Sequence, residues 1–247
     1  MQIQTIEDAI RKQRIPKATA TYTPVPNGLI IDEVRSFAET SGLQVIRETF
    51  GIARKGNQST FTWCFRKEGE DEIGIALGIR NSYDKSLSFE LAWGASVIVC
   101  TNGMFRVEGV ESYLKRLHTG EAIPVIKEAI WNGNHEREME FLKAQAEAMK
   151  FQKLSTKEMA QLAGELYITE KVVNGPQLAA LRKEILKPTY NYGGNNDTLW
   201  DFNNHVTAVL KDGHPGSALK AHHKLHGFLE SEFGLVKESY ADELVRL

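Results

Sequence analysis

Cysteine is scarce in this chain. Its 247 residues include only Cys64 and Cys100, too few for a disulfide framework, and this scarcity favours a reduced, cytoplasmic location. Neither cysteine has a histidine near it in the sequence, so we expect both to be structural residues in strands. Long apolar runs are missing too: none approaches about 18 residues, the length at which a membrane span is expected. The N-terminal stretch carries acids and lacks an apolar core, so we expect no secretory signal and no membrane partner.

An excess of charge of one sign is also missing. The chain has 30 Lys and Arg against 32 Asp and Glu, a net charge of -2. Residues 1–42 carry five basic and five acidic residues, residues 43–120 carry ten and nine, and residues 121–247 carry fifteen and eighteen. A duplex-DNA binder usually has a strongly basic domain, because neutralised phosphates supply much of its affinity. Only a local basic surface therefore stays a candidate for nucleic acid.

The common catalytic signatures are absent as well. The sequence has no GxGxxG, no Walker A loop, no HExxH, no pair of CxxC motifs and no GxSxG. We therefore expect a non-catalytic protein without a cofactor. The composition, 42% hydrophobic and 25% charged, is that of a folded globular chain and excludes intrinsic disorder.

Before residue 120, the sequence has mainly the pattern of β-strands. After a short predicted helix over residues 30–41, apolar and small or polar residues alternate in four segments, residues 43–54, 58–67, 72–80 and 86–100. Phe61, Trp63 and Phe65 are an example, although Val45 breaks the alternation of the first segment. Such alternation is typical of strands with one buried face. The connections are too short for parallel crossovers, so the segments predict an antiparallel meander.

After residue 120, the pattern becomes helical. Helices are predicted over residues 121–132, 134–152, 155–167, 175–187, 197–211 and 216–233. Ser155 and Glu158 predict a capping box, Gly175-Pro176 a helix start, and Asp197 the cap of the helix at 198–211. We predict an α+β fold: an antiparallel β-meander packed with helices over residues 1–120, followed by a helical C-terminal half over residues 121–247, in one integrated domain.

Two surfaces of the predicted sheet are candidates for binding. Small residues share one face of the third and fourth strands, namely Gly74, Ala76, Gly78, Ala92 and Gly94. Either a packed helix or a groove for a ligand or a nucleic-acid backbone would need them. We favour the helix. Basic residues lie on the strands and turns: Arg54, Lys55, Arg66, Arg80 and Lys85. Cations beside aromatic side chains can bind single strands of nucleic acid, whereas a solvated rim is the alternative.

Histidines cluster near the C-terminus. His222 and His226 are four residues apart on a predicted helix, a spacing that suits two ligands of one metal ion. His214, His205 or Asp201 could supply a third ligand. Exposed histidines on a helix face are the commoner outcome, so we predict no metal site and keep His222 and His226 as candidates.

Three short stretches carry a family resemblance. They are RNSYDKS at residues 80–86, VIVCTNGM at 97–104 followed by LHTG at 117–120, and WDFNNHVT at 200–207. In this order they resemble motifs of a phage- and plasmid-borne family, domain of unknown function 932. The residues that carry the resemblance are Asn81, Asp84, Cys100, Asn102, His118, Trp200, Asp201, Asn204 and Thr207. Gly103 departs from the family pattern, which often has threonine or another polar residue there.

The resemblance implies a protein of a mobile genetic element that works inside a bacterial cell, near recombination and anti-restriction functions. We therefore expect a non-catalytic accessory protein of a bacteriophage or plasmid that binds single-stranded nucleic acid and acts as a homo-oligomer. An anti-defence or host-takeover protein that binds a host protein through its helices is the alternative. A metal-dependent enzyme centred on His222 and His226 is a third, less favoured one.

Overall fold

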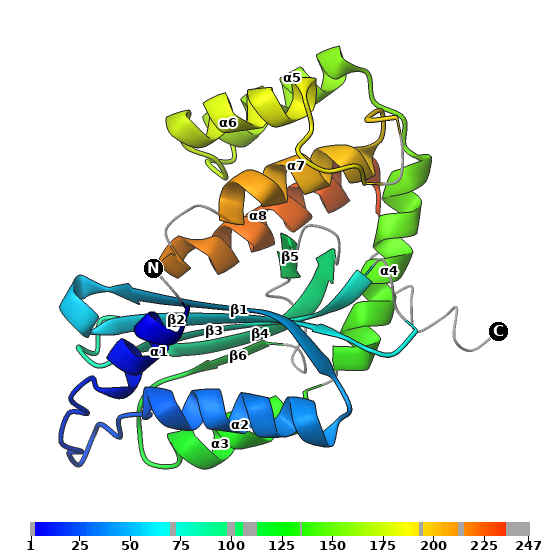
Figure 1. Cartoon of the computed structure of the whole chain (residues 1–247). Coiled ribbons are helices and arrows are strands. Elements are labelled where there is room, and N and C mark those ends of the chain that lie inside the picture. Colours follow the sequence, from blue (N-terminus) through cyan, green and yellow to red (C-terminus); the bar gives the residue numbers. More distant parts are fainter. Residues whose placement is uncertain are drawn as a thin grey trace.

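The fold is an antiparallel sheet with helices on both sides (Figure 1). The computed structural model describes residues 3–69, 73–97, 102–105, 113–133, 135–192, 195–211 and 215–235. Its strands are β1 (Gln44–Ala53), β2 (Gln58–Arg66), β3 (Ile73–Ser82), β4 (Phe89–Val97), β5 (Asn102–Phe105) and β6 (Tyr113–Arg116). Its α-helices are α1 (Ile3–Arg11), α2 (Asn27–Thr40), α3 (Ala122–Trp131), α4 (His135–Phe151), α5 (Thr156–Ile168), α6 (Gly175–Leu186), α7 (Leu199–Lys211) and α8 (Pro215–Phe233).

The predicted α+β class is confirmed. Strands β1 to β4 form the predicted antiparallel meander, in the order β1-β2-β3-β4. Beyond β4 the sheet divides, because β6 pairs with residues 89–92 of β4 and β5 pairs with residues 94–97. These two strands were not predicted, since four residues are too few for a clear alternation. Among the described residues, no helix is long and apolar enough to cross a membrane.

A break in register explains why Val45 interrupts the alternation of β1. The pairing of β1 with β2 shifts between Val45 and Arg47, which leaves Ile46 without a partner opposite. One extra residue in a strand turns the following side chains to the other face. Val45 therefore lies opposite Phe65, on the face that also carries the apolar side chains of β2.

The hydrophobic core has two parts. One lies between the aromatic face of the sheet and α2 and α3, and includes Phe61, Trp63 and Phe65, each at most 1% exposed. The other joins α4 to α8, and Ile73 of β3 reaches into it. Figure 1 shows α2 and α3 on one side of the sheet and α7 and α8 on the other.

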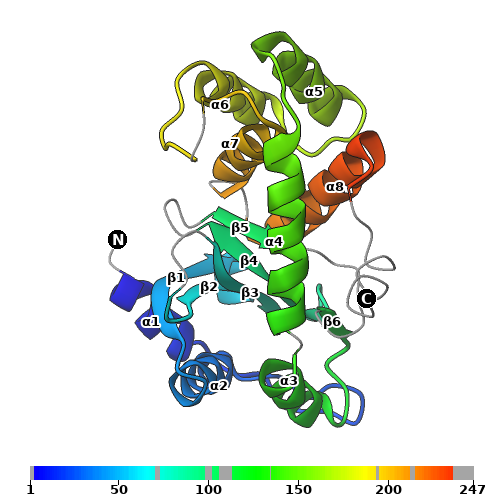
Figure 2. The same cartoon turned by 90° about the vertical axis from the view of Figure 1, so that its right-hand side faces the viewer.

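The small-residue face of the sheet is buried. Ala76 and Ala92 are 0% exposed, and Gly74, Gly78 and Gly94 are buried as well. At Gly74 a Cβ atom would lie 2.2 Å from the carbonyl oxygen of Phe65, so only glycine fits. Helix α4 packs against β3 and β4, and Figure 2 shows it crossing the sheet from α3 toward α7. These contacts agree with a packed helix rather than with an open groove.

Candidate functional site

The candidate site lies at one end of the sheet, where two turns of the meander meet. The backbone N–H of Tyr83, after β3, donates to the carbonyl of Asn57, before β2, at 2.7 Å. The side chain of Gln58 donates to Ser86 Oγ at 2.8 Å and ties the same two turns together. The segment before α2 and the segment after β6 join them. We call the residues of these four segments, 12–27, 54–59, 81–88 and 115–119, the basic end.

A buried asparagine links three of the segments. Asn81 is 1% exposed, and its amide nitrogen donates to the carbonyl of Val25 at 2.8 Å and to Asn27 Oδ1 at 2.7 Å. Its amide oxygen lies 2.7 Å from Nε2 of His118. Since an amide oxygen can only accept, Nε2 of His118 carries the proton. Burial lowers the pKa of His118, which keeps the ring neutral near pH 7.

The same network fastens the segment of residues 12–27 to the sheet. The side chain of Asn27 donates to Gln13 Oε1 at 2.7 Å and to Ser59 Oγ at 3.0 Å. The backbone N–H of Thr23 donates to the carbonyl of His118 at 2.7 Å. Buried hydrogen bonds of this kind specify one arrangement of the chain, although Gln13 Nε2 has no partner among the described residues. The four segments are therefore held in a fixed relation to one another.

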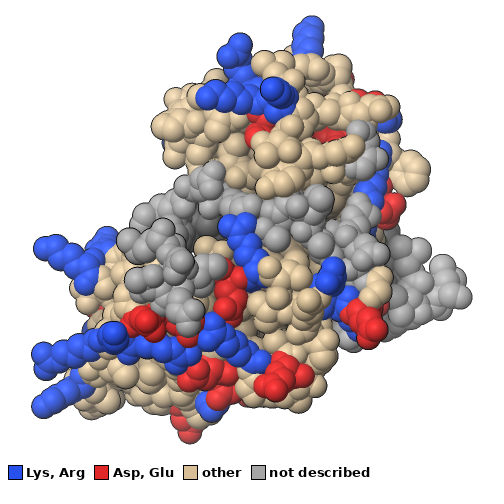
Figure 3. Space-filling model, viewed as in Figure 1, with Lys and Arg blue, Asp and Glu red and all other residues tan. Residues whose placement is uncertain are grey.

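The surface of this end is strongly cationic. Apart from Lys115, which forms a 3.7 Å ion pair with Glu90, seven exposed residues carry the charge: Lys12, Arg14, Lys17, Arg54, Lys55, Lys85 and Arg116. Asp84 is the only carboxylate in these four segments. Lys and Arg side chains project into solvent at the left end of the sheet in Figure 3. A chain with a net charge of -2 thus concentrates positive charge at one end of its sheet.

Three of the seven cations occupy an unusual backbone conformation. Arg54, Lys55 and Lys85 have φ angles of 47°, 55° and 60°, a left-handed region that disfavours long side chains. In the β1–β2 turn the N–H of Asn57 donates to the carbonyl of Arg54, so Lys55 and Gly56 are its central residues. Turns with two left-handed central residues favour Asn-Gly. A lysine at this position costs stability that asparagine would not.

The β3–β4 turn carries Asp84, the carboxylate of the basic end. Asp84 accepts hydrogen bonds from the backbone and the hydroxyl of Ser86. Partial burial raises the pKa of Asp84, but the Ser86 hydrogen bonds and the charge of Arg54 outweigh it and lower the pKa overall. The ammonium of Lys85 lies 4.8 Å from the centre of the Tyr22 ring, a favourable cation–π contact.

The five cations predicted to bind nucleic acid do not all lie together in the structure. Arg54, Lys55 and Lys85 come together at the basic end. Arg80 forms a 2.6 Å ion pair with Glu90 of β4. Arg66 lies at the opposite end of β2, where its Nε donates to Gln44 at 3.1 Å. The cations between residues 12 and 17 were missed, although the absence of acids between residues 9 and 31 was a usable signal.

Comparison with known families decides where the chain belongs. A family model described as a domain of unknown function (DUF932) matches residues 17–230. The chain belongs to the DUF932 family. No curated protein and no solved structure matches it. The match covers the basic end except for residues 12–16, and it ends within α8.

The DUF932 motif residues of α7 have structural roles. The backbone N–H of Asp201 donates to Thr198 Oγ1, and Asp201 Oδ2 accepts from the backbone N–H of Thr198, both at 3.1 Å. This reciprocal pair is a capping box, so Thr198 caps the helix. The predicted cap, Asp197, instead forms a 2.8 Å ion pair with Lys153.

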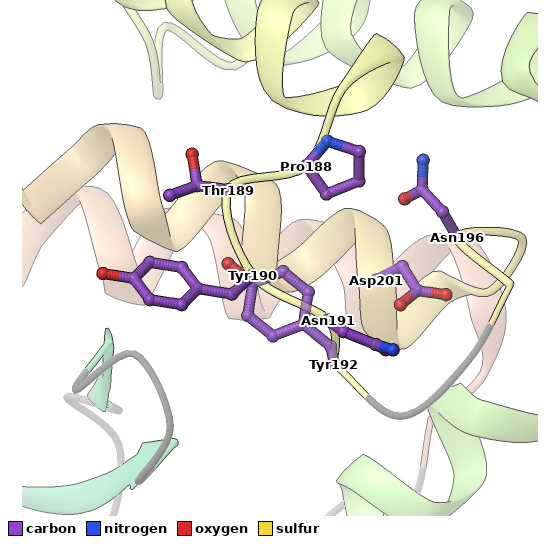
Figure 4. A pocket seen from close by; sticks show the side chains of 7 residues that line it. All are labelled: Pro188, Thr189, Tyr190, Asn191, Tyr192, Asn196 and Asp201. Carbon is purple, nitrogen blue, oxygen red and sulfur yellow. The ribbon is translucent and has the colours of Figure 1, made fainter.

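Asp201 also lines a small cavity of about 240 Å³. The other lining residues are Pro188, Thr189, Tyr190, Asn191, Tyr192 and Asn196 (Figure 4). Asn196 donates to the carbonyl of Ile185 and lies within hydrogen-bond distance of His205, and Thr189 donates to Glu184. Much of the polar lining thus bonds to residues of α6 and α7, which fits a structural role for this segment.

A buried polar stripe follows along α7. Trp200, Asn203, Asn204 and Thr207 are each at most 1% exposed. The Asn204 amide donates to the carbonyl of Trp200 at 2.9 Å, and the Thr207 hydroxyl donates to the carbonyl of Asn204 at 3.1 Å. Both side-chain polar atoms of Asn203 lack a hydrogen-bond partner in the part of the chain that the structure describes.

The candidate metal ligands lie inside the protein. His222 and His226 of α8 are 4% and 2% exposed, so the expectation of exposed histidines was wrong. Burial lowers the pKa of His222 to about 4. Across the described ranges, no three His, Cys, Asp or Glu side chains are grouped so that they could hold a metal ion. His214 lies outside the described residues.

The DUF932 motif residues therefore fall in two regions. Asn81, Asp84 and His118 belong to the basic end. Trp200, Asp201, Asn204 and Thr207 belong to α7, which contacts β5, the strand that begins at Asn102. Cys64 is buried in β2, whereas Cys100 lies outside the described residues.

Proposed function

We propose that this DUF932 protein binds the phosphate backbone of single-stranded nucleic acid through its basic end. The observation that carries the proposal is the set of seven exposed cations, with one carboxylate, on four segments that hydrogen bonds hold together. Phosphate contacts release condensed counterions, so a local cationic surface gives affinity even when the whole chain is slightly acidic.

The surface favours contacts to phosphates over direct recognition of the base sequence. Its cations are borne mainly by turns and a loop. The only helical residues of the four segments are the short 3-10 turn Arg54–Gly56 and the first residue of α2, so no α-helix is available to enter a major groove. The aromatic residues Phe61, Trp63 and Phe65 are buried, so they cannot stack on bases as the sequence pattern had suggested. Phosphate contacts fix position but carry no sequence information. We therefore expect little sequence preference.

The strained turns add support. Arg54, Lys55 and Lys85 stay left-handed although glycine or asparagine would fit better. Such a cost is typical of sites where the side chain serves binding. The proposal includes a non-catalytic, recombination-associated role in a phage or plasmid, in the bacterial cytoplasm. It also includes several copies on one strand, because linked sites multiply a weak single contact.

The test is fluorescence anisotropy of labelled single-stranded and duplex oligonucleotides across a salt series. The triple variant R54A/K55A/K85A removes three cations from the basic end. A matched variant, K157A/R182A/K187A, removes three exposed cations from α5, α6 and the residue after α6. We expect the first variant to lose most of its low-salt affinity and to lower the salt slope by about 2, at roughly 0.7 per single-strand phosphate. The matched variant should bind like the unmodified protein; equal affinity of all three proteins would contradict the proposal.

A host-protein partner is the second candidate function. Phe151, Ile168 and Leu186, at the ends of α4, α5 and α6, are 84%, 73% and 61% exposed. Exposed apolar residues of this size favour protein docking when they act together. Nuclease-treated pull-down from a host lysate should then return one stoichiometric protein. That protein should be lost with F151A/I168A/L186A and kept with the basic-end triple variant; loss with neither variant would exclude this surface.

A further inference from the structure

Two large aliphatic side chains are exposed among the cations of the basic end. Ile15 is 49% exposed and lies between Arg14 and Lys17 in the chain. Leu117 is 67% exposed and follows Arg116. Neither belongs to either part of the hydrophobic core.

Both residues are next to anchored positions. Gln13, two residues before Ile15, accepts hydrogen bonds from Asn27 and Ser59. His118, directly after Leu117, is bonded to Asn81 through its ring and to Thr23 through its carbonyl. The chain is therefore anchored within two residues of each of these side chains.

The positive charge around Ile15 and Leu117 limits the kind of partner that could cover them. A partner that neutralises the surrounding cations must be anionic, and one that covers Ile15 and Leu117 must also offer apolar surface. A single strand of nucleic acid supplies both, because its unpaired bases expose their faces beside a continuous line of phosphates. A duplex keeps those faces stacked inside and offers mainly phosphates and groove edges.

We infer that Ile15 and Leu117 pack against the faces of unpaired bases while the neighbouring cations contact the phosphates. Aliphatic side chains are known to pack against or between bases in this way. The inference rests on the proposed function and deepens it, since it gives the site a physical reason to prefer an unpaired strand over a duplex. It also assigns base contacts to side chains outside the buried aromatic face of the sheet.

The test distinguishes contacts to the bases from contacts to the phosphates. Anisotropy is measured with labelled oligothymidylate, with an abasic strand of the same length and with a duplex, for the unmodified protein and for I15A/L117A. A matched variant, F151A/I168A, removes two exposed apolar side chains from α4 and α5. We expect the unmodified protein and the matched variant to bind oligothymidylate about tenfold more tightly than the abasic strand, a difference that the loss of two apolar contacts can account for. I15A/L117A should lose this preference and keep its abasic-strand affinity and salt slope.

Three outcomes would overturn the inference in distinguishable ways. Equal binding of abasic and base-bearing strands by the unmodified protein would remove the base contacts and leave phosphate binding intact. A preference that survives in I15A/L117A would show that other residues contact the bases. No binding of any strand at low salt would overturn the proposed function itself.

Discussion

Two asparagines of this protein are equally buried and differently used. Asn81, at the basic end, is 1% exposed and makes hydrogen bonds to Val25, Asn27 and His118. Asn203, in α7, is 0% exposed, and neither of its amide atoms has a partner among the described residues. The first amide joins segments that display cations, whereas the second belongs to a polar stripe inside the helical half. Burial of a polar side chain alone therefore does not reveal its role; its partners do.

The largest expected effect is a loss of stability in acid, and it arises mainly from His222 in the helical half. The pKa of His222 is lowered by burial from its ordinary 6.5 to about 4. Between these values the unfolded chain binds a proton that the folded chain does not, so stability is lost as the pH falls from about 6.5 to 4. The shift predicts a loss of about 3 kcal/mol by pH 4. Urea unfolding at pH 7, 5 and 4 measures it.

The control for this prediction is His222→Gln, which should flatten the dependence on pH. Burial lowers the pKa of His118 and of His205 as well, so a smaller slope remains in that variant. An unchanged slope in the glutamine variant would show that other groups cause the acid sensitivity.

Replacement of either asparagine is expected to cause the next largest change in unfolding free energy. Asn81→Ala leaves the hydrogen-bonding groups of Val25, Asn27 and His118 without their partner. We expect this to cost about 2–3 kcal/mol of unfolding free energy. Asn203→Leu removes a buried amide that has no partner among the described residues, so we expect it to stabilise the fold by about 1 kcal/mol. Urea unfolding at pH 7 compares them. A clearly destabilised Asn203→Leu protein would mean that a bound molecule or a residue outside the described ranges satisfies this amide.

A smaller effect is expected in the β1–β2 turn, where stability and binding should move in opposite directions. Lys55→Asn places a residue that tolerates the left-handed conformation at a φ of 55°. We expect a gain of about 0.5–1 kcal/mol in unfolding free energy. The same change should weaken single-strand binding a few-fold at low salt. Thermal unfolding and anisotropy on one preparation measure both, and a variant that is less stable would show that Lys55 makes a contact that holds the turn.

The smallest effect is expected from the carboxylate at the basic end. Asp84→Asn keeps an oxygen that can accept from Ser86 and removes the negative charge near Arg54. We expect about a two- to threefold gain in single-strand affinity at low salt, which should vanish at high salt through screening. Weaker binding would instead mean that Asp84 positions the turn through its charge.

Local patterns predicted much of the fold. The alternation around Phe61, Trp63 and Phe65 identified the meander, and Ser155 with Glu158 forms the predicted capping box. Helix α1 was not predicted, and His222 was expected at the surface because spacing on a helix does not say which side the rest of the fold covers. The bulge at Ile46 and the short strands β5 and β6 are invisible to a period-two pattern.

The candidate site was predicted only in part, because its members are distant in sequence. Arg54, Lys55 and Lys85 were recognised as basic turns, and an antiparallel meander places its first and third turns at the same end. Nothing local indicated that Gln13 or His118 would join them. Hydrogen bonds such as those of Asn81 depend on tertiary contacts, so the assembly of four segments became visible only in the structure.

The bond between Thr23 and His118 has a consequence for the order in which the protein folds. The segment of residues 12–27 is synthesised first, yet its anchors lie on β2, on β3 and after β6. Contacts between distant residues close large loops and form slowly. During synthesis, the early cations must therefore wait for the middle of the chain, and the complete basic surface arises only when residue 118 has left the ribosome and docked.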